Sequence, residues 1–494
     1  MVFCSSLLIE EVDFYRMNGS EKKCSFGGSL LAVLFLCVAM VVQIFILKQD
    51  YITHITLLLS CVVAGGVAMA SGFTFDDVQD GVLHGCKIAM LPALILMLVG
   101  VLISALISAG TIPTLIYYGL QILSPSIFLM TVCVICTVSS ISTGSSWTTG
   151  ATFGVAFMGI GYGLGIPAPM IAGAIISGAI FGDKMSPLSD STNLAAGVAE
   201  ADLFDHVRSM VYTTGPAILI SILLYGLMGL KFKSGTINDE QISVILTGLA
   251  TNYKISVITL LPVIAVIGLA IKRVNGLAVM MVASLIGGIF ALAYQGYGLG
   301  EIANFMNYGV KSETGVKVVD KLLSRGGLQS MMWTISLSFV ALSYAGILEK
   351  TGMLEVILGK ISSIVSSVRG LIVVHVLSAI VVGIFSATQY IAIIIPSRML
   401  TPVYKRLKIL PQVNSRTSED SATVTSPLVP WGLCGVYFAG VLGVSTMDYM
   451  PYVFLAYLTP LIAMLYGVFN IFIFKEGDIK TARMYSETET KSAA

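Results

Sequence analysis

The stretch Gly182-Asp183-Lys184-Met185-Ser186-Pro187-Leu188-Ser189-Asp190-Ser191-Thr192-Asn193 follows a run from Ile160 to Phe181 that contains no charged residue. About 20 apolar residues are enough to span a bilayer. Charged groups at membrane depth are costly, and they indicate a functional site there. The stretch therefore predicts a helix that is interrupted inside a membrane and that carries a polar site at the interruption.

The position of the interruption is predicted from local preferences. Gly182 suits the end of a helix that begins near residue 168, and Ser186 followed by Pro187 suits the cap and first position of the next helix. Asp190 then lies in the first turn, where the helix dipole favours a negative charge. Broken helices of this kind supply carbonyl groups that coordinate cations in transporters.

Composition places the whole chain in a membrane. The 494 residues are 56% hydrophobic and 11% charged, whereas soluble proteins carry about 25% charged residues. Mean hydropathy is +0.90, which predicts an all-α polytopic membrane protein. A net charge of +1 argues against a nucleic-acid partner, and no glycine-rich nucleotide loop supports ATP-driven pumping. Cys133 and Cys136 have redox or zinc spacing but apolar neighbours, so packing is expected.

Twelve segments are expected in the membrane, beginning with a retained first span rather than a signal peptide. They are 30–47, 52–71, 88–108, 126–163, 168–182, 209–230, 255–271, 276–296, 328–348, 371–400, 427–445 and 451–474. The segments 126–163 and 371–400 are too long for one helix and contain a polar break, which predicts re-entrant hairpins. Two ordinary helices joined by a polar turn are the alternative in each case. The predicted tips are Thr143, Ser145 and Ser146 in the first hairpin and Ser386, Thr388 and Gln389 in the second.

An internal repeat is predicted from matching motifs about 240 residues apart. Gly110-Thr111-Ile112 corresponds to Thr351-Gly352-Met353, and Ser186-Pro187-Leu188 to Ser426-Pro427-Leu428. The expected division is an N-terminal cytoplasmic segment (1–29), N-terminal spans (30–87), transport repeat 1 (88–230), linking spans and an exposed loop (231–327), transport repeat 2 (328–474) and a tail (475–494). Basic clusters at Lys272-Arg273 and at 398–416 place both termini inside the cell and give the two repeats inverted topology.

The polar stretch and its second copy supply the candidate ligands. Oxygen atoms suit a hard cation and carboxylates accept protons, so we expect Na⁺ at Asp183 and Asp190. The complete set of ion-binding and proton-coupling candidates is Asp183, Ser186, Ser189, Asp190, Thr192, Asn193, Glu419, Asp420, Thr423 and Thr425.

Each of these residues also has a structural interpretation. Asp183 is able to pair with Lys184 or a distant basic group, Asp190 to cap a helix, and the hydroxyl and amide groups to bond neighbouring helices. Arg416 is near enough in the sequence to pair with Glu419 or Asp420.

Three further residues have open interpretations. Arg398 is expected to anchor the chain at the cytoplasmic surface, or otherwise to neutralise a substrate carboxylate or pair with a site aspartate. His206, beside Asp202 and Asp205, is expected at the surface, with pH sensing as the alternative. His375 lies in an apolar segment and is expected to be structural.

Long motifs of the chain resemble the NhaC family of Na⁺/H⁺ antiporters, within the ion transporter superfamily. They are Phe181–Leu194, Asp202–His206 with Tyr212–Thr214, Ser415–Ser421 with Thr423–Trp431, and Gly110–Leu115. The resemblance covers nearly all of the chain after about residue 30. It implies inverted repeats with re-entrant hairpins, which agrees with the hairpins predicted above.

The resemblance implies a secondary antiporter, not an enzyme, that exchanges Na⁺, or Li⁺, for H⁺ in a bacterial inner membrane and serves pH homeostasis. Its partners would be Na⁺, H⁺ and lipid, without a cofactor. The family also includes exchangers of malate or lactate with H⁺ and Na⁺, which is the alternative. After Pro430-Trp431 the chain has Gly432-Leu433 where a polar Asn-Thr pair is expected. The sequence leaves the oligomeric state open, a homodimer included.

Overall fold

The computed structural model describes residues 23–47, 53–232, 239–272, 274, 276–362 and 365–477. Within these residues the regular elements are helices, apart from one isolated bridge between Ile409 and Lys475. In this part of the chain, seven helices are long and apolar enough to cross a membrane, or up to ten if each of three bent pairs counts as one span. The predicted all-α membrane fold is confirmed. The outermost parts of the predicted terminal segments, 1–22 and 478–494, lie outside the described residues.

The first half of the chain contains one continuous series of helices after the N-terminal pair. The pair is α2 (Phe26–Val41), extended by the π-helical turn η1 (Val42–Leu47), and α3 (Thr53–Ala70). The series is α4 (Phe75–Ser108), α5 (Thr111–Ile122), α6 (Pro125–Thr143), α7 (Ser146–Thr149), η3 (Gly150–Gly154), α8 (Val155–Gly163), α9 (Ala168–Met185), α10 (Asp190–Val198) and α11 (Leu203–Gly229).

The second half contains a matching series. It comprises α17 (Met332–Lys350), α18 (Met353–Ser362), α19 (Val368–Ser386), α20 (Gln389–Arg406), α21 (Pro411–Ser418), η8 (Glu419–Thr423), η9 (Ser426–Leu428), α22 (Leu433–Leu442), α23 (Thr446–Tyr449), η10 (Met450–Tyr452) and α24 (Phe454–Phe469). Between the two series lie α12 (Asp239–Asn252), α13 (Leu261–Ile271), α14 (Gly276–Phe290), α15 (Leu299–Tyr308) and α16 (Lys317–Leu323). Helices α15 and α16 occupy the predicted exposed connection, which is therefore partly helical.

Left-handed backbone positions show that the two series repeat one another. Each position with positive φ at a helix end in the first series has a counterpart about 240 residues later, as expected of an internal duplication. The pairs are Gly110 with Gly352, Gly144 with Ala387, Gly165 with Lys408, and Glu200 with Gly443. The residue that caps the following helix also corresponds, because Asp202 caps α11 and Ser445 caps α23.

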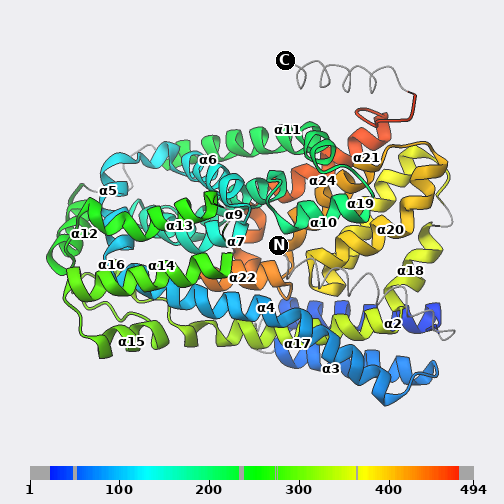
Figure 1. Ribbon diagram of the computed structural model, residues 1–494, viewed down its shortest axis with the longest axis horizontal. Helices are drawn as coiled ribbons and strands as arrows, with labels where there is room; N and C mark the ends of the chain where they lie inside the picture. The colour runs from blue at the N-terminus through cyan, green and yellow to red at the C-terminus, as the bar shows by residue number, and fades with distance from the viewer. Residues whose placement is uncertain are drawn as a thin grey trace.

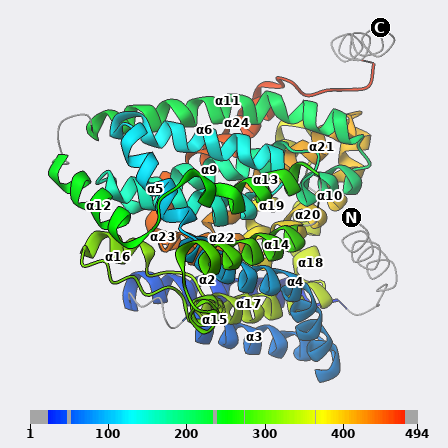
Figure 2. The ribbon, with the colours of Figure 1, turned by 60° about the vertical axis from the view of Figure 1, so that its left-hand side comes forward.

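The first long helices of the two series, α4 and α17, run antiparallel to each other. A Cβ atom on Gly81 would meet Gly346 and Ile347, one on Gly85 would meet Leu342, and one on Gly100 would meet Gly327. Contacts therefore move backward along α17 as they move forward along α4. Both helices lie side by side in Figures 1 and 2. Antiparallel equivalent helices are what an inverted repeat requires.

Both predicted breaks within long apolar segments are present. Helix α6 ends at Gly144 with φ of 66°, and Ser145 then caps α7 by accepting from the Thr148 amide. Helix α19 ends at Ala387 with φ of 55°, and Thr388 caps α20 by accepting from the Tyr390 amide. In each case a left-handed residue reverses the chain and a hydroxyl satisfies the first amides of the returning helix.

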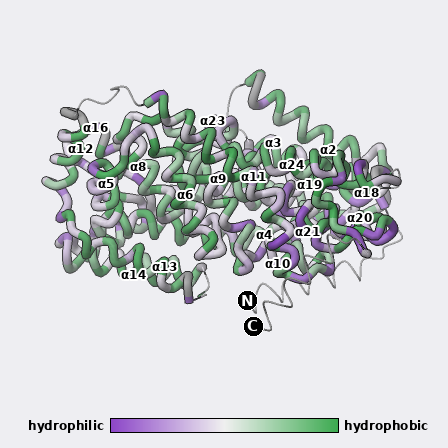
Figure 3. The backbone as a smooth tube through the Cα atoms, turned by 90° about the horizontal axis from the view of Figure 1, so that it is seen from above, coloured by the Kyte–Doolittle hydropathy of each residue, from purple (hydrophilic) through white to green (hydrophobic). Residues whose placement is uncertain are grey.

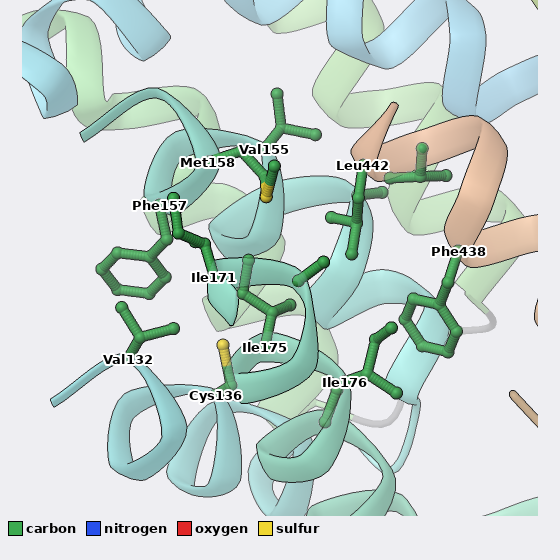
Figure 4. Close-up of a cluster of buried hydrophobic side chains, with 14 of the residues drawn as sticks. Val132, Cys136, Val155, Phe157, Met158, Ile171, Ile175, Ile176, Phe438 and Leu442 are labelled. Carbon is green, nitrogen blue, oxygen red and sulfur yellow. The ribbon is translucent and has the colours of Figure 1, made fainter. Parts of the chain in front are cut away.

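An apolar core holds the first hairpin against the broken helix that carries the polar stretch. In Figure 4, Ile171, Ile175 and Ile176 of α9 lie between side chains of α6 and of α22, among them Cys136 and Phe438. Cys133 and Cys136 are both buried and unbonded to another cysteine, which confirms their packing role. The core thereby fixes α9 so that its polar end faces the middle of the molecule.

Candidate functional site

The broken helix of the first series is interrupted slightly later than predicted. Helix α9 continues to Met185, and α10 begins at Asp190 with Ser189 as its extended N-cap residue. The predicted helix end at Gly182 and cap at Ser186 are therefore wrong. Gly182 lies inside α9, where it permits close contact with α6. A Cβ atom at this position would come 2.5 Å from the Ile141 amide nitrogen. Asp190 does lie in the first turn of the second half-helix, as predicted.

Asp183 lies in a cage of hydroxyl groups at this break. Its side chain accepts from the Ser146 amide at 3.2 Å and from the Ser146 hydroxyl at 2.6 Å, both at Oδ2. The Ser189 hydroxyl donates to Oδ1 at 2.6 Å. Asp183 is 9% exposed, so these donors supply the stabilisation of negative charge that water would give elsewhere. We call Asp183, Ser146 and Ser189 the Asp183 cage.

The first hairpin tip supplies one wall of the cage. The Ser186 hydroxyl donates to the Ile141 carbonyl at 2.9 Å, and a Cβ atom on Gly144 would meet Leu188 at 2.7 Å. The tip and the break are therefore in direct contact, which brings Ser146 onto Asp183. Of the predicted tip residues, Thr143 and Ser145 bond one another and the tip backbone.

The other polar residues of the break have structural contacts. The Thr192 hydroxyl donates to the Lys184 carbonyl at 2.8 Å, and the Asn193 amide donates to the Ser189 and Pro187 carbonyls. The bond from Thr192 satisfies a carbonyl that the end of α9 leaves open. Asp190 is exposed, and no hydrogen bond joins its carboxylate to the cage in the described part of the chain. The structure thus brings Asp183 and Ser189 together and leaves Asp190 at the rim.

A buried ion-pair cluster connects this break to the second series. Lys184 donates to Asp420 Oδ1, and Arg416 Nε lies 3.9 Å from Asp420 Oδ2. Thr213 of α11 also donates to Asp420 Oδ1 at 2.9 Å. Lys184, Asp420 and Arg416 are each at most 2% exposed. Lys184 therefore pairs with Asp420, not with Asp183. Arg416, expected to pair with Glu419 or Asp420, pairs with Asp420.

Glu419 lies beside this cluster without a hydrogen-bond partner. Its side chain is 0% exposed, and neither carboxylate oxygen completes a hydrogen bond. The charges of Lys184 and Asp183 act on it, and the hydroxyls of Thr423 and Ser191 are adjacent to it. The Thr423 hydroxyl is likewise unpartnered. Because a buried polar group without a partner is rare, this carboxylate requires an explanation.

Two buried histidines flank the cluster. His206 is 0% exposed, and both of its ring nitrogens lack partners, so its predicted surface position is wrong. Phe204, two positions earlier and therefore on the opposite side of α11, is exposed instead. His375 is buried against the Tyr404 and Ser418 hydroxyls at 2.9 and 3.0 Å, in agreement with a structural role.

The second tip packs on the second break. The Leu433 amide donates to the Ala387 carbonyl, and the Ser426 hydroxyl donates to Gln389 at 3.2 Å. Ser386 donates to the Thr388 carbonyl, and Thr425 donates to the Ser421 carbonyl within its own helix. The second half-helix α22 begins with Leu433, whereas α10 begins with Asp190. The polar residues are therefore distributed unequally between the two repeats.

The first hairpin tip also contacts helix α22 through aromatic side chains. The Trp147 and Tyr437 rings are stacked with centroids 4.2 Å apart, and the Tyr437 hydroxyl donates to the Trp147 carbonyl at 2.5 Å. Trp147 directly follows the cage residue Ser146. Figure 3 shows hydrophilic segments gathered around α10, α20 and α21 in a largely hydrophobic molecule. The site lies where the breaks and tips of both series converge.

Sequence reasoning overlooked Lys184 and Thr213 as site residues. Lys184 was available as a signal, since a lysine directly after a buried aspartate has to find a partner of its own. Thr213 belongs to the Tyr212–Thr214 motif, but no local pattern indicates that it faces Asp420.

Arg398 lines a separate pocket of about 460 Å³ with Lys23 and Glu355.

The donor set of the site suits a hard monovalent cation. Within the described residues no group of three or more histidine, cysteine or acidic side chains has the arrangement for a metal ion. Hydroxyl, carbonyl and carboxylate oxygens are the ligands that hard cations prefer. The Asp183 cage offers one carboxylate and two hydroxyls next to the open end of a helix.

The chain is similar to known antiporters over most of its length. Residues 24–192 and 178–471 match the Na⁺/H⁺ antiporter family. The chain is 38% identical to the Na⁺/H⁺ antiporter NhaC of Alkalihalophilus pseudofirmus, covering 94% of this chain and 100% of that one. It is 35% identical to the malate-2H⁺/Na⁺-lactate antiporter of Bacillus subtilis, covering 92% and 97%.

A third relative is the arginine/ornithine antiporter ArcD of Halobacterium salinarum, at 38% identity, covering 92% of this chain and 94% of that one. The three named activities differ, but all three proteins are antiporters, and each aligns over more than nine-tenths of both chains. The family match and these alignments together show that the chain belongs to the NhaC family of Na⁺/H⁺ antiporters.

Proposed function

We propose that the chain exchanges Na⁺, and also Li⁺, for H⁺ across a bacterial inner membrane. Family membership supports secondary antiport, but relatives of similar identity are named for Na⁺, for malate and lactate, and for arginine and ornithine. The choice among these substrates therefore depends on the chemistry of the site.

One observation carries the choice of a cation. The two buried basic residues of the site, Lys184 and Arg416, both face Asp420, while the unpartnered carboxylate is Glu419. An anionic substrate needs a positive group that is not already neutralised, because bringing a negative charge into a buried site is costly. The site offers negative charge in excess, which favours Na⁺ and H⁺.

The Asp183 cage is the proposed Na⁺ site. In the present state the Ser146 and Ser189 hydroxyls donate to Asp183. A hydroxyl carries one rotatable hydrogen and two lone pairs. Rotation of the two O–H bonds therefore turns a lone pair of each oxygen toward an arriving ion. Na⁺ would then take the place of these two hydrogen bonds and balance the negative charge of the Asp183 carboxylate. Asp190, at the rim, is proposed to attract the cation by its charge.

Exchange follows if Na⁺ and H⁺ neutralise the same excess negative charge. A site that is charged when empty is costly to move through a low-dielectric barrier, and either ion removes that cost. The antiparallel packing of α4 against α17 and the two tip-to-break contacts support a movement of one repeat relative to the other. Each movement would carry one type of ion, which couples the two flows in opposite directions.

Exchange of organic acids is the second candidate. Arg398 and Lys23 line a pocket of about 460 Å³, which is large enough for a small carboxylate. Glu355 lies in the same pocket and partly offsets their positive charge. For that reason we place the organic-acid exchange second.

The test uses purified protein in liposomes that contain a pH dye and have an acidic interior. External Na⁺, Li⁺, K⁺, malate, lactate or arginine is added in separate trials. The account predicts that Na⁺ or Li⁺ alone makes the interior more alkaline, and that Asp183→Asn abolishes the response. A response only to an organic acid, lost in Arg398→Gln, would replace the proposal with the second candidate.

A further inference from the structure

We propose that Glu419 carries the proton that Na⁺ displaces, so that Na⁺ binding at the Asp183 cage and proton release from Glu419 are coupled one to one. This inference rests on the proposed function and names the residue that carries its proton. It starts from the charges that the fold buries together.

The buried cluster contains more acidic than basic groups. Lys184 and Arg416 are positive, whereas Asp183, Glu419 and Asp420 are acidic, and each of the five side chains is at most 9% exposed. With all five ionised the cluster carries one net negative charge. A buried charge of that kind is expensive unless it is paired. One monovalent cation or one proton balances the cluster.

Hydrogen bonding indicates which acid holds the proton. Asp420 accepts hydrogen bonds from Lys184 and Thr213 and lies near Arg416. Asp183 accepts three hydrogen bonds from Ser146 and Ser189. These contacts stabilise negative charge on both aspartates. Glu419 receives no aligned donor on either oxygen. A neutral Glu419 therefore accounts for its unpartnered oxygens at the lowest cost.

The elements packed against the Glu419 segment carry further charged and titratable groups. His206 is buried near Lys184 and Arg416, and His375 is bonded to two hydroxyls. Besides the two histidines, these groups include Asp183, Lys184, Asp190, Tyr404, Arg416, Asp420 and Tyr466.

Two states of the cluster are then neutral. In one, Glu419 is protonated and the cage is empty; in the other, Na⁺ lies in the cage and Glu419 is ionised. Na⁺ together with a protonated Glu419 would leave a net positive charge. The proton leaves the Glu419 carboxyl oxygen as H⁺, and its electron pair stays on the carboxylate. The two ions therefore compete although they occupy different residues.

The experiment measures Na⁺ binding and proton release in the same sample. Purified protein in weakly buffered detergent with a pH dye receives NaCl, and choline chloride controls for ionic strength. We expect about one proton released per Na⁺ bound by the wild type. Glu419→Gln, which mimics the protonated acid, should bind Na⁺ more weakly than the wild type at high pH, because the occupied cluster then carries a net positive charge, and it should release little or no proton on binding. Its Na⁺ affinity should be independent of pH, whereas wild-type affinity should weaken by about tenfold per pH unit on the acid side.

A Glu419→Gln variant that releases as many protons per bound Na⁺ as the wild type would overturn the inference. Glu301→Gln, a surface carboxylate outside the cluster, is the matched control and should behave as the wild type. If Glu419→Gln does not fold, the infrared difference spectrum of the wild type decides. Na⁺ should remove the carbonyl band of a protonated carboxylic acid, and an unchanged band would contradict the inference. Absence of any Na⁺ binding by the wild type would instead overturn the proposed function itself.

Discussion

Lys184 and Asp420, 236 positions apart in the sequence, form a fully buried ion pair between the broken helices of the two repeats. Lys184 directly follows Asp183, and Asp420 directly follows Glu419. One contact thereby places the cage carboxylate and the unpartnered carboxylate in the same cluster. The pair joins the two breaks and leaves Asp183 and Glu419 unpaired with Lys184.

Breaking this pair should strongly destabilise the protein. Lys184→Met or Asp420→Asn leaves a buried charge without its partner, which costs about 3–5 kcal/mol. The double variant Lys184→Met/Asp420→Asn should lose less than the sum of the two single variants. Denaturant unfolding of the detergent-solubilised protein measures the cycle. Lys405→Met is the control, because the Lys405–Glu200 pair is exposed and contributes about 0–1 kcal/mol. Strict additivity of the single changes would contradict a direct interaction.

Removing one hydroxyl of the cage should weaken Na⁺ binding while leaving the protein folded. Ser146→Ala loses a 2.6 Å contact with Asp183, and a hydrogen bond or ligand to a charged group is worth about 1.5–3 kcal/mol. The KM for Na⁺ in proteoliposomes should therefore rise by at least about tenfold. Ser142→Ala removes a nearby hydroxyl that bonds only the Val138 carbonyl, and its KM should stay at the wild-type value. Equal KM values for both variants would argue against the cage.

Tyr437 should act through the tip that carries Ser146. Tyr437→Phe keeps the ring stacked on Trp147 but removes the hydrogen bond to the Trp147 carbonyl. We expect a KM for Na⁺ that is higher by roughly 5-fold, since a neutral hydrogen bond contributes about 1 kcal/mol. Tyr457→Phe is matched to it, because Tyr457 is exposed and bonds the Met450 carbonyl away from the cage. Unchanged Na⁺ kinetics in Tyr437→Phe would show that the tip is positioned without this bond.

Gly85 should be essential for packing between the two repeats. A Cβ atom at this position would lie 1.9 Å from the Leu342 carbonyl oxygen of α17, so Gly85→Ala forces the two helices apart. We expect a loss of about 1–3 kcal/mol, as for other overpacked sites, together with low yield of folded protein. Gly66→Ala on α3 meets no atom within 4 Å and should be neutral or slightly stabilising. Normal thermal stability of Gly85→Ala would contradict the described packing.

The connection between the repeats should loosen in acid. Burial acts to raise the pKa of Asp320, but donors from Thr314 and Ser312 outweigh it and hold the pKa below its usual value. Because the folded-state pKa is lowered, the stabilisation is present above the unfolded pKa and is lost as pH falls through the folded pKa. Hydrogen exchange around residues 310–325, compared at equal intrinsic exchange rates, should increase on acidification. Asp320→Asn should show the faster exchange already at neutral pH, and a pH-independent pattern in the wild type would refute the effect.

Much of this fold follows from the sequence, because hydrophobic length and helix-ending residues are local properties. The breaks near Gly144 and Ala387 and the repeat itself were predictable from short motifs. The exact end of α9 was not, since Gly182 is set by contact with α6 and not by helix termination. The inward position of His206 likewise depends on the way α11 packs against distant helices.

The site was predictable in part for the same reason. The polar stretch contains Asp183 and Ser189, and the second copy contains Glu419 and Asp420, all four of which are buried in the structure. Pairing across 236 positions is not encoded in any local pattern, so Lys184 was not assigned to Asp420. The exposure of Asp190 and the intrahelical bond of Thr425 become visible only when the helices are assembled.

The most direct test of Na⁺/H⁺ exchange at Asp183 is uptake of radioactive Na⁺ into proteoliposomes with an acidic interior. The account predicts saturable uptake by the wild type and by Glu301→Gln that stops when a proton ionophore removes the pH gradient. Asp183→Asn, inserted to the same level, should take up no more Na⁺ than protein-free liposomes. Uptake by Asp183→Asn at the wild-type rate would contradict the account.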